Sequence, residues 1–201
     1  MSDWHDEFLA APLHTRSEVL SAPCPVPAAP GLYGWWFDRM PCSHIDASGC
    51  QTRDEWTLLY VGISPSKPHN AEKPSSPTLR KRVCTHCRGR AATSTLRLSL
   101  GSLLADELGL ELRRVGTAGK RHFGCDEAVL SDWMSEHARV SCIVYTAPWL
   151  CERELIHRLD LPLNLAENAD HSFHATLSQA RSDAKGRADA LPVLRNCRRK
   201  S

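Results

Sequence analysis

The sequence predicts a small mixed α/β domain. Three short runs rich in apolar and aromatic residues are typical of strands, and they cover residues 31–37, 57–63 and 139–145. Longer stretches with helical spacing of apolar residues lie between and after these runs, without the regular strand-helix-strand alternation of a parallel sheet. The length of 201 residues is also sufficient for one domain with a sizeable core.

The first half of the predicted sheet is a pair of consecutive strands. Four prolines between residues 21 and 30 make the entry segment irregular, because no helix could cross it. The strands at 31–37 and 57–63 are expected to pair as an antiparallel hairpin, although a long polar loop separates them. A second loop, rich in proline and serine, follows at residues 64–77.

Helices make up most of the remaining chain. Asp126 and Thr146 are expected to cap two of them, and Pro148 suits a first helical turn. Pro162 follows the end of the helix that Thr146 opens. The helices are predicted at about residues 78–88, 95–110, 126–137, 146–159 and 172–191.

Composition indicates a reduced, non-membrane protein. Lys and Arg number 25 against 23 Asp and Glu, a net charge of +2, and 42% of residues are hydrophobic. We find no run of about 18 uncharged apolar residues, the length that spans a membrane. The acidic, polar start MSDWHDEF is unlike a signal peptide, so we expect a cytoplasmic protein. Nine cysteines, an odd number at low density, favour free thiols.

The charge is distributed unevenly along the chain. Residues 1–60 hold eight acidic and three basic side chains, a net charge of −5. Residues 78–122 hold ten basic and three acidic side chains, a net charge of +7. The basic segment therefore predicts a surface for a polyanion, and its alternative is an ordinary solvated face.

Helical spacing places three polar residues on inward faces. At 100° per residue, Glu152 lies about 20° from Leu159 and about 40° from Ile156, on the apolar stripe of its helix. A carboxylate there requires a partner, either a metal ion or a buried Arg. In the helix at 78–88, Arg82 and His86 are one turn apart and share the inward face with Leu79. Such a set suits phosphodiester chemistry, because Arg neutralises phosphate charge, a metal polarises oxygen and His handles a proton.

Taken together, these residues resemble the GIY-YIG nuclease superfamily. The two name motifs correspond to Gly31-Leu32-Tyr33 and Tyr60-Val61-Gly62. A helix with Leu79, Arg82 and His86 follows, as in the family. Downstream, Glu152 precedes Leu155-Ile156, and Asn164 of a Pro-x-Asn motif comes 12 residues after the Glu. The resemblance covers about residues 30–168.

The resemblance implies an α+β fold, a three-stranded antiparallel sheet flanked by helices, and a divalent-metal-dependent endonuclease that hydrolyses DNA. One Mg²⁺ or Mn²⁺ per active site would be held by Glu152, while Arg82 would contact the scissile phosphate. Tyr33 is favoured over Tyr60 as the base that activates water, with His86 close by, and Asn164 would orient the site. The DNA backbone would be bound by the exposed basic residues Arg80, Lys81, Arg88 and Arg90.

The predicted organisation also contains additions to a minimal family domain. An irregular segment at 1–29 would precede a nuclease domain at 30–168, and a C-terminal helix with a basic tail would occupy 169–201. Insertions at about 38–56 and 88–137 would determine substrate specificity. A homodimer is one arrangement that could cut both strands with one site per subunit.

Two alternative functions remain. One is a nucleic-acid-binding module on the same fold without catalysis. The other is an interaction protein stabilised by zinc, because Cys84-Thr85-His86-Cys87 contains a C-x-x-C and the insertion offers further ligands. Dispersed buried thiols are the expectation that we favour over a zinc site. The cysteine and histidine residues concerned are Cys42, His44, Cys50, Cys84 and Cys87.

Overall fold

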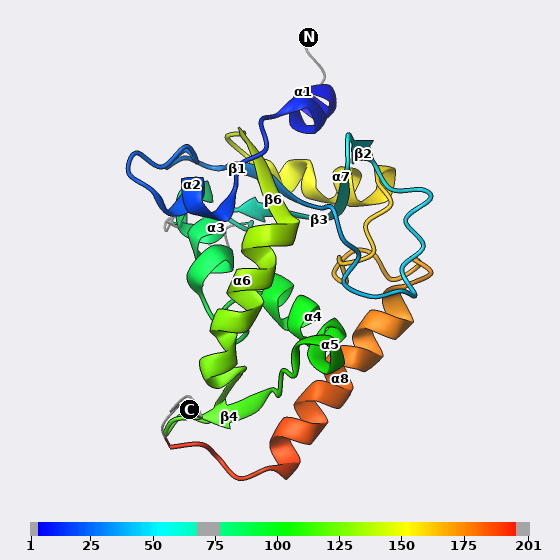
Figure 1. The fold of residues 1–201 in the computed structure, drawn as a ribbon. Helices are drawn as coiled ribbons and strands as arrows, with labels where there is room; N and C mark the ends of the chain where they lie inside the picture. Colours follow the sequence, from blue (N-terminus) through cyan, green and yellow to red (C-terminus); the bar gives the residue numbers. More distant parts are fainter. Residues whose placement is uncertain (1–3, 68–76, 196–201) are drawn as a thin grey trace.

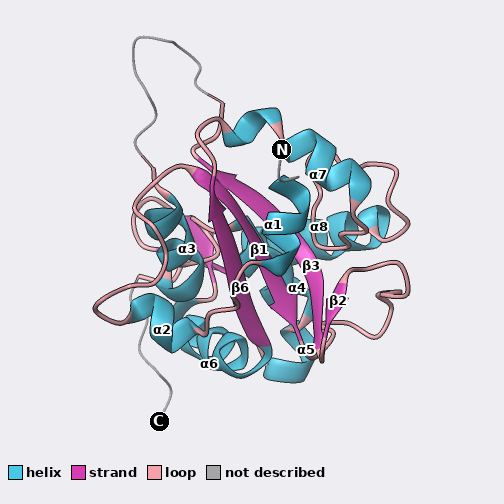
Figure 2. Ribbon diagram, turned by 90° about the horizontal axis from the view of Figure 1, so that it is seen from above, coloured by secondary structure: helices cyan, strands magenta, loops and turns pink. Residues whose placement is uncertain are grey.

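The protein folds around one antiparallel sheet with helices on both faces. The computed structural model describes residues 4–67 and 77–195. In order across the sheet, the strands are β2, β3, β1 and β6 (Figure 1; Figure 2). They span Thr52–Arg53, Trp56–Ser64, Gly31–Phe37 and Ala138–Val144, respectively. The three predicted strands are thus present within one or two residues, and β1 lies between the other two.

The sheet has four strands rather than the three that we expected. The additional strand β2 is two residues long, belongs to the segment 38–56 that we predicted to be an insertion, and pairs with the start of β3. A two-residue turn joins β2 and β3, with Asp54 in the left-handed region at φ 52°. Thr and Arg alone have no apolar alternation, so the sequence carried no strand signal at this edge.

The helices confirm most of the predicted segments and add others. The segment predicted at 95–110 is broken at Leu104, and the segment at 146–159 begins as a 3₁₀ turn, Pro148–Leu150, without a hydrogen bond from a Thr146 cap. Two short helices, α1 and α2, lie in the N-terminal part that we expected to be irregular. The α-helices are α1 Trp4–Ala10, α2 Arg16–Leu20, α3 Leu79–Arg88, α4 Thr95–Leu103, α5 Ala105–Leu108, α6 Glu127–His137, α7 Glu152–Arg158 and α8 His174–Ala190.

The second insertion contains a hairpin that the sequence analysis did not anticipate. Its strands, β4 (Arg113–Val115) and β5 (Lys120–His122), pair with each other and not with the main sheet. Gly116 and Gly119 in the turn have φ values of 71° and 56°, a conformation that glycine adopts without strain. Helix α8 packs along α4, and its C-terminal end reaches this hairpin (Figure 1).

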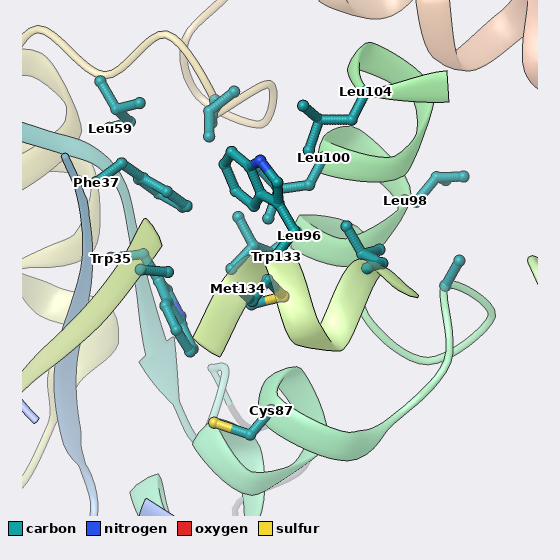
Figure 3. Packing of buried hydrophobic residues seen from close by; sticks show 14 of the residues in the cluster. Trp35, Phe37, Leu59, Cys87, Leu96, Leu98, Leu100, Leu104, Trp133 and Met134 are labelled. Carbon is teal, nitrogen blue, oxygen red and sulfur yellow. The ribbon is translucent and has the colours of Figure 1, made fainter. Parts of the chain in front are cut away.

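The two faces of the sheet carry different helices. Side chains of α3, α4, α6 and α8 form one core with Tyr33, Trp35 and Leu59, and part of it is seen in Figure 3. Helices α1 and α7 form the other core with Leu32 and Leu58. None of the helices in the described segments is long and apolar enough to cross a membrane.

Candidate active site

The two name motifs bring Tyr33 and Tyr60 to the same sheet face. Tyr33 on β1 pairs with Gly62 on β3, and Trp35 pairs with Tyr60, so these positions share one side of the sheet. The ring centroids of the two tyrosines are 6.4 Å apart. A Cβ on Gly62 would collide with the ring and hydroxyl of Tyr33, and a Cβ on Gly31 would collide with the Ile143 carbonyl of β6. Both motif glycines are therefore required by close approach.

A buried hydrogen-bond chain begins at Tyr33. Its hydroxyl lies 2.9 Å from His86 Nε2, and His86 Nδ1 lies 2.7 Å from the Ser94 hydroxyl. Ser94 is the N-cap of α4 and also accepts a hydrogen bond from the backbone N–H of Arg97. These hydrogen bonds therefore link β1 to the first turn of α4.

The two titratable groups of this hydrogen-bond chain, Tyr33 and His86, both have pKa values shifted in favour of the neutral form. Burial, and then the charges of Arg82 and Arg97, lower the pKa of His86 well below its usual value. Burial and the neighbouring Tyr60 raise the pKa of Tyr33 well above its usual value, although Arg82 opposes this shift. A free tyrosinate at Tyr33 is consequently disfavoured, which the sequence alone could not show.

Arg82 and Glu152 reach the two tyrosines from different helices. Arg82 is half-buried on α3, and its Nε donates to the Tyr33 hydroxyl at 3.4 Å. Glu152 is the first residue of α7 and is half-buried, whereas Glu154 is exposed and pairs with Arg158. The inward positions predicted from helical spacing are confirmed for Arg82, His86 and Glu152.

The Glu152 carboxylate is chemically suited to a hard cation. It makes no hydrogen bond or ion pair with any described residue, and burial followed by the nearby Glu167 raises its pKa. The residues that the structure describes contain no group of three His, Cys, Asp or Glu side chains that could hold a metal ion. A single carboxylate suits Mg²⁺, which keeps several waters and binds through one or two carboxylates and phosphate.

Asn164 holds the second name motif in place. Its side chain accepts from the backbone N–H of Val61 at 2.9 Å and donates to the Val61 carbonyl at 3.0 Å. Val61 lies between Tyr60 and Gly62. The amide therefore acts as a further pairing partner for β3 and orients the two residues that flank Val61.

A hollow of about 440 Å³ collects the predicted catalytic residues. Tyr33, Tyr60, Arg82 and Glu152 line it, and we call it the central hollow. His86 lies behind it, fully buried and in contact through Tyr33. The arrangement places a cation, an anion and two hydroxyls around one space that a phosphodiester could enter.

A groove of about 750 Å³ along α3 adjoins the central hollow. Arg80, Lys81 and Arg88 line this α3 groove, and Lys81 and Thr85 line both spaces. Arg90 is exposed but lines neither of them, and its charge acts on His122 of β5. Three of the four predicted backbone-binding residues thus lie beside the central hollow.

Several other bases of the +7 segment bond to other residues of the protein. Arg97 is fully buried, and its guanidinium bonds Glu127 at 2.7 Å and the His86 carbonyl at 3.3 Å. Arg114 donates to carbonyls of the α8 end, and Arg121 forms a two-bond ion pair with Asp189. The basic surface is therefore narrower than the sequence count suggested, and it is concentrated on α3.

The cysteine and histidine residues considered as zinc ligands make separate contacts with other residues. Cys42 Sγ lies 3.4 Å from His44 Nδ1. Burial raises the pKa of Cys50 and of Cys87 to about 12, and both thiols belong to the main core. His86 of the C-x-x-C segment is occupied by Tyr33 and Ser94.

Sequence reasoning missed two residues close to the site, Ser94 and Arg181. Arg181 lines a further hollow of about 310 Å³ with Tyr60 and Glu152, and we call it the α8 hollow. A signal for Arg181 was available. Leu177, Ala184 and Ala188 form the buried stripe of α8, and Arg181 falls within about 40° of Leu177 at 100° per residue.

Comparison with known protein families agrees with this geometry. The chain matches the family model described as the GIY-YIG catalytic domain over residues 31–183. The match takes in every residue of the central hollow and extends along α8 to include Arg181. The comparisons with curated proteins and with solved structures found no match. With its family model matched over most of its length, the chain belongs to the GIY-YIG catalytic domain family and is a nuclease.

Proposed function

We propose that the protein is a divalent-metal-dependent endonuclease that hydrolyses phosphodiester bonds in DNA. The single observation that carries this proposal is the central hollow, where Tyr33, Tyr60, Arg82 and Glu152 from four separate elements converge. The unpaired half-buried carboxylate of Glu152 and the half-buried guanidinium of Arg82 suit, respectively, a cation and a phosphate.

Two charged groups would act on the phosphate. Arg82 is anchored by the Thr93 carbonyl and the Tyr33 hydroxyl, and it would neutralise charge that develops on the phosphoryl oxygens. Glu152 would hold one Mg²⁺ or Mn²⁺, which would stabilise the negative charge that develops on the phosphate. Asn164 would act indirectly, as a positioning residue for β3.

Tyr33 and His86 would share the handling of the proton. The Tyr33 oxygen accepts from Arg82 Nε, which leaves its own proton facing His86 Nε2 at 2.9 Å. In the proposed step, water attacks phosphorus while the bond from phosphorus to one sugar oxygen breaks. The water proton passes to the Tyr33 oxygen, the Tyr33 proton passes to His86 Nε2, and the departing sugar oxygen takes a proton from solvent. The negative phosphate beside Arg82 would favour the resulting imidazolium, which burial and the charges of Arg82 and Arg97 disfavour.

The test is nicking of supercoiled plasmid DNA by the purified full chain with Mg²⁺, with Mn²⁺ and with EDTA. We expect cleavage with either metal and none with EDTA. Removal of the Tyr33 hydroxyl in Tyr33→Phe should lower the single-turnover rate by about 10²-fold or more, the range of general acid–base catalysis. Tyr60→Phe is the matched control and should lower the single-turnover rate less. The Tyr60 hydroxyl lies within hydrogen-bond distance of Thr95 but not of His86.

The non-catalytic binding module is the alternative that this test separates. Plasmid binding without nicking under either metal would favour it. Each chain has one central hollow, so cleavage of both strands would take two chains or two visits. The homodimer remains a prediction, checked by the molecular mass of the protein on DNA.

A further inference from the structure

Arg181 has a position that the proposed chemistry does not use. It lies on the buried stripe of α8, beside Leu177 and Ala184. It makes no hydrogen bond or ion pair with any residue that the structure describes, although the guanidinium is half-buried. Burial lowers the pKa of Arg181, so this cation is partly removed from water without an anion of the protein to compensate it.

The α8 hollow adjoins the central hollow. Its lining includes Tyr60 and Glu152, which also line the central hollow, together with Thr95 and Ser99 of α4. On the other side, Lys81 and Thr85 connect the central hollow to the α3 groove. The central hollow therefore shares lining residues with both the α3 groove and the α8 hollow, and each of these two spaces has at least one basic side chain in its lining.

We propose that the α8 hollow is a second phosphate-binding subsite, in which Arg181 binds a phosphodiester of the strand being cut, beside the scissile phosphate. This inference rests on the proposed DNA endonuclease activity. A guanidinium binds phosphate oxygens through two parallel N–H bonds, which suits a partly desolvated Arg without a carboxylate partner. Thr95, whose hydroxyl lies 3.4 Å from that of Tyr60, offers a second polar group at the same wall. Arg82 and Arg181 would then hold successive phosphates from opposite sides of Glu152.

The experiment measures binding of an oligonucleotide duplex carrying the sequence that the wild-type protein nicks, by fluorescence anisotropy in EDTA at several salt concentrations. Arg181→Ala should weaken binding by about tenfold, as expected for one charge-assisted contact. It should also lower the slope of log K against log salt by about 0.9. Alanine suits a helix interior and the side chain makes no described bond, so α8 should remain folded, as circular dichroism would check.

Arg187→Ala is the matched control. Arg187 is on the same helix but lines a separate space with Asp106 and Phe123, which shares no residue with the α8 hollow. This variant should bind as the wild type does. Arg181→Lys should keep the salt slope while losing part of the affinity, because it keeps the charge and loses the two-bond geometry.

Duplexes with one neutral methylphosphonate at a time locate the contact. In the wild type, neutralising the phosphate at one position that flanks the scissile phosphate should weaken binding about as much as Arg181→Ala does. In Arg181→Ala, neutralising that same phosphate should not weaken binding further. Wild-type affinity and salt slope in Arg181→Ala, or equal sensitivity to neutralisation at every position in both proteins, would overturn the subsite. A wild type that binds DNA but does not cut it overturns the endonuclease, and affinity and salt slope of the wild type and Arg181→Ala are then compared on a duplex of fixed arbitrary sequence. A wild type that neither binds nor cuts overturns both proposals.

Discussion

At the scale of single residues, the site combines groups that are each unfavourable alone. His86 is fully buried between two arginines, and Glu152 is half-buried beside Glu167. Their partners explain how they are tolerated: His86 has hydrogen bonds at both ring nitrogens, and Glu152 faces a hollow that a cation can enter. Such combinations are typical of functional sites.

His86 makes stability depend on pH. Its pKa is lowered well below the usual value in the folded protein, so below about pH 6.5 the unfolded chain takes up a proton that the folded chain does not. The stability that depends on neutral His86 is therefore present above this pH and is lost as the pH falls. Between pH 7.5 and 5.5 the loss should be about 1.4 kcal/mol for this one group.

Urea unfolding of the wild type and of His86→Asn at the two pH values measures this loss. The variant is less stable at both pH values, but its free energy of unfolding should fall by about 1.4 kcal/mol less than that of the wild type between them. Equal falls in the two proteins would show that His86 titrates alike in the folded and unfolded states.

At the scale of elements, the spacing of apolar residues in the sequence predicted which faces of the helices point inward. The inward faces of α3 and α7, and with them Arg82, His86 and Glu152, followed from residues one turn apart. It could not predict β2 or the β4–β5 hairpin, because two or three mainly polar residues carry no periodicity. Nor could it predict the Tyr33–His86–Ser94 chain, which depends on how α3 and α4 pack against β1.

The pairing of β1 with β3 makes Gly62 sensitive to any side chain. A methyl group at Gly62→Ala would meet the Tyr33 ring and displace it from His86. We expect the free energy of unfolding to fall by about 1–3 kcal/mol, as for overpacked cores, and the cleavage rate to fall at least tenfold. Thermal or urea unfolding and single-turnover cleavage measure the two effects.

Gly186→Ala is the control for Gly62→Ala. Gly186 lies inside α8, and a Cβ there meets nothing within 4 Å. Alanine should raise the free energy of unfolding by about 0.5–1 kcal/mol without changing the cleavage rate. The explanation for Gly62 would be wrong if the two substitutions changed the free energy of unfolding in the same direction.

At the scale of the whole molecule, the uneven charge is explained in two ways. Part of the +7 segment forms ion pairs within the protein, namely the buried Arg97–Glu127 pair and the exposed Arg121–Asp189 pair. The other part, on α3, lines the groove beside the central hollow. Net charge along the sequence therefore did not distinguish the basic residues that pair within the protein from those that line the α3 groove.

This division predicts different salt dependence for two arginines of the segment. Arg88→Ala should lower the slope of log K against log salt for duplex DNA by about 0.9, because Arg88 lines the α3 groove and would release counterions on binding. Arg121→Ala should leave the slope unchanged, since its guanidinium is paired with Asp189. Binding isotherms between low and moderate salt provide the measurement, and equal slopes for both variants would exclude the α3 groove as a backbone contact.

The most direct test of the nuclease centre compares two glutamates two residues apart on α7. Glu152 faces the central hollow, whereas Glu154 is exposed and pairs with Arg158. With Mg²⁺, Glu152→Gln should nick supercoiled plasmid at least about a hundredfold more slowly than the wild type, because a catalytic metal contributes several kcal/mol and each 1.4 kcal/mol is tenfold. Glu154→Gln should nick at the wild-type rate. Nicking by Glu152→Gln as fast as by the wild type would contradict the proposed centre.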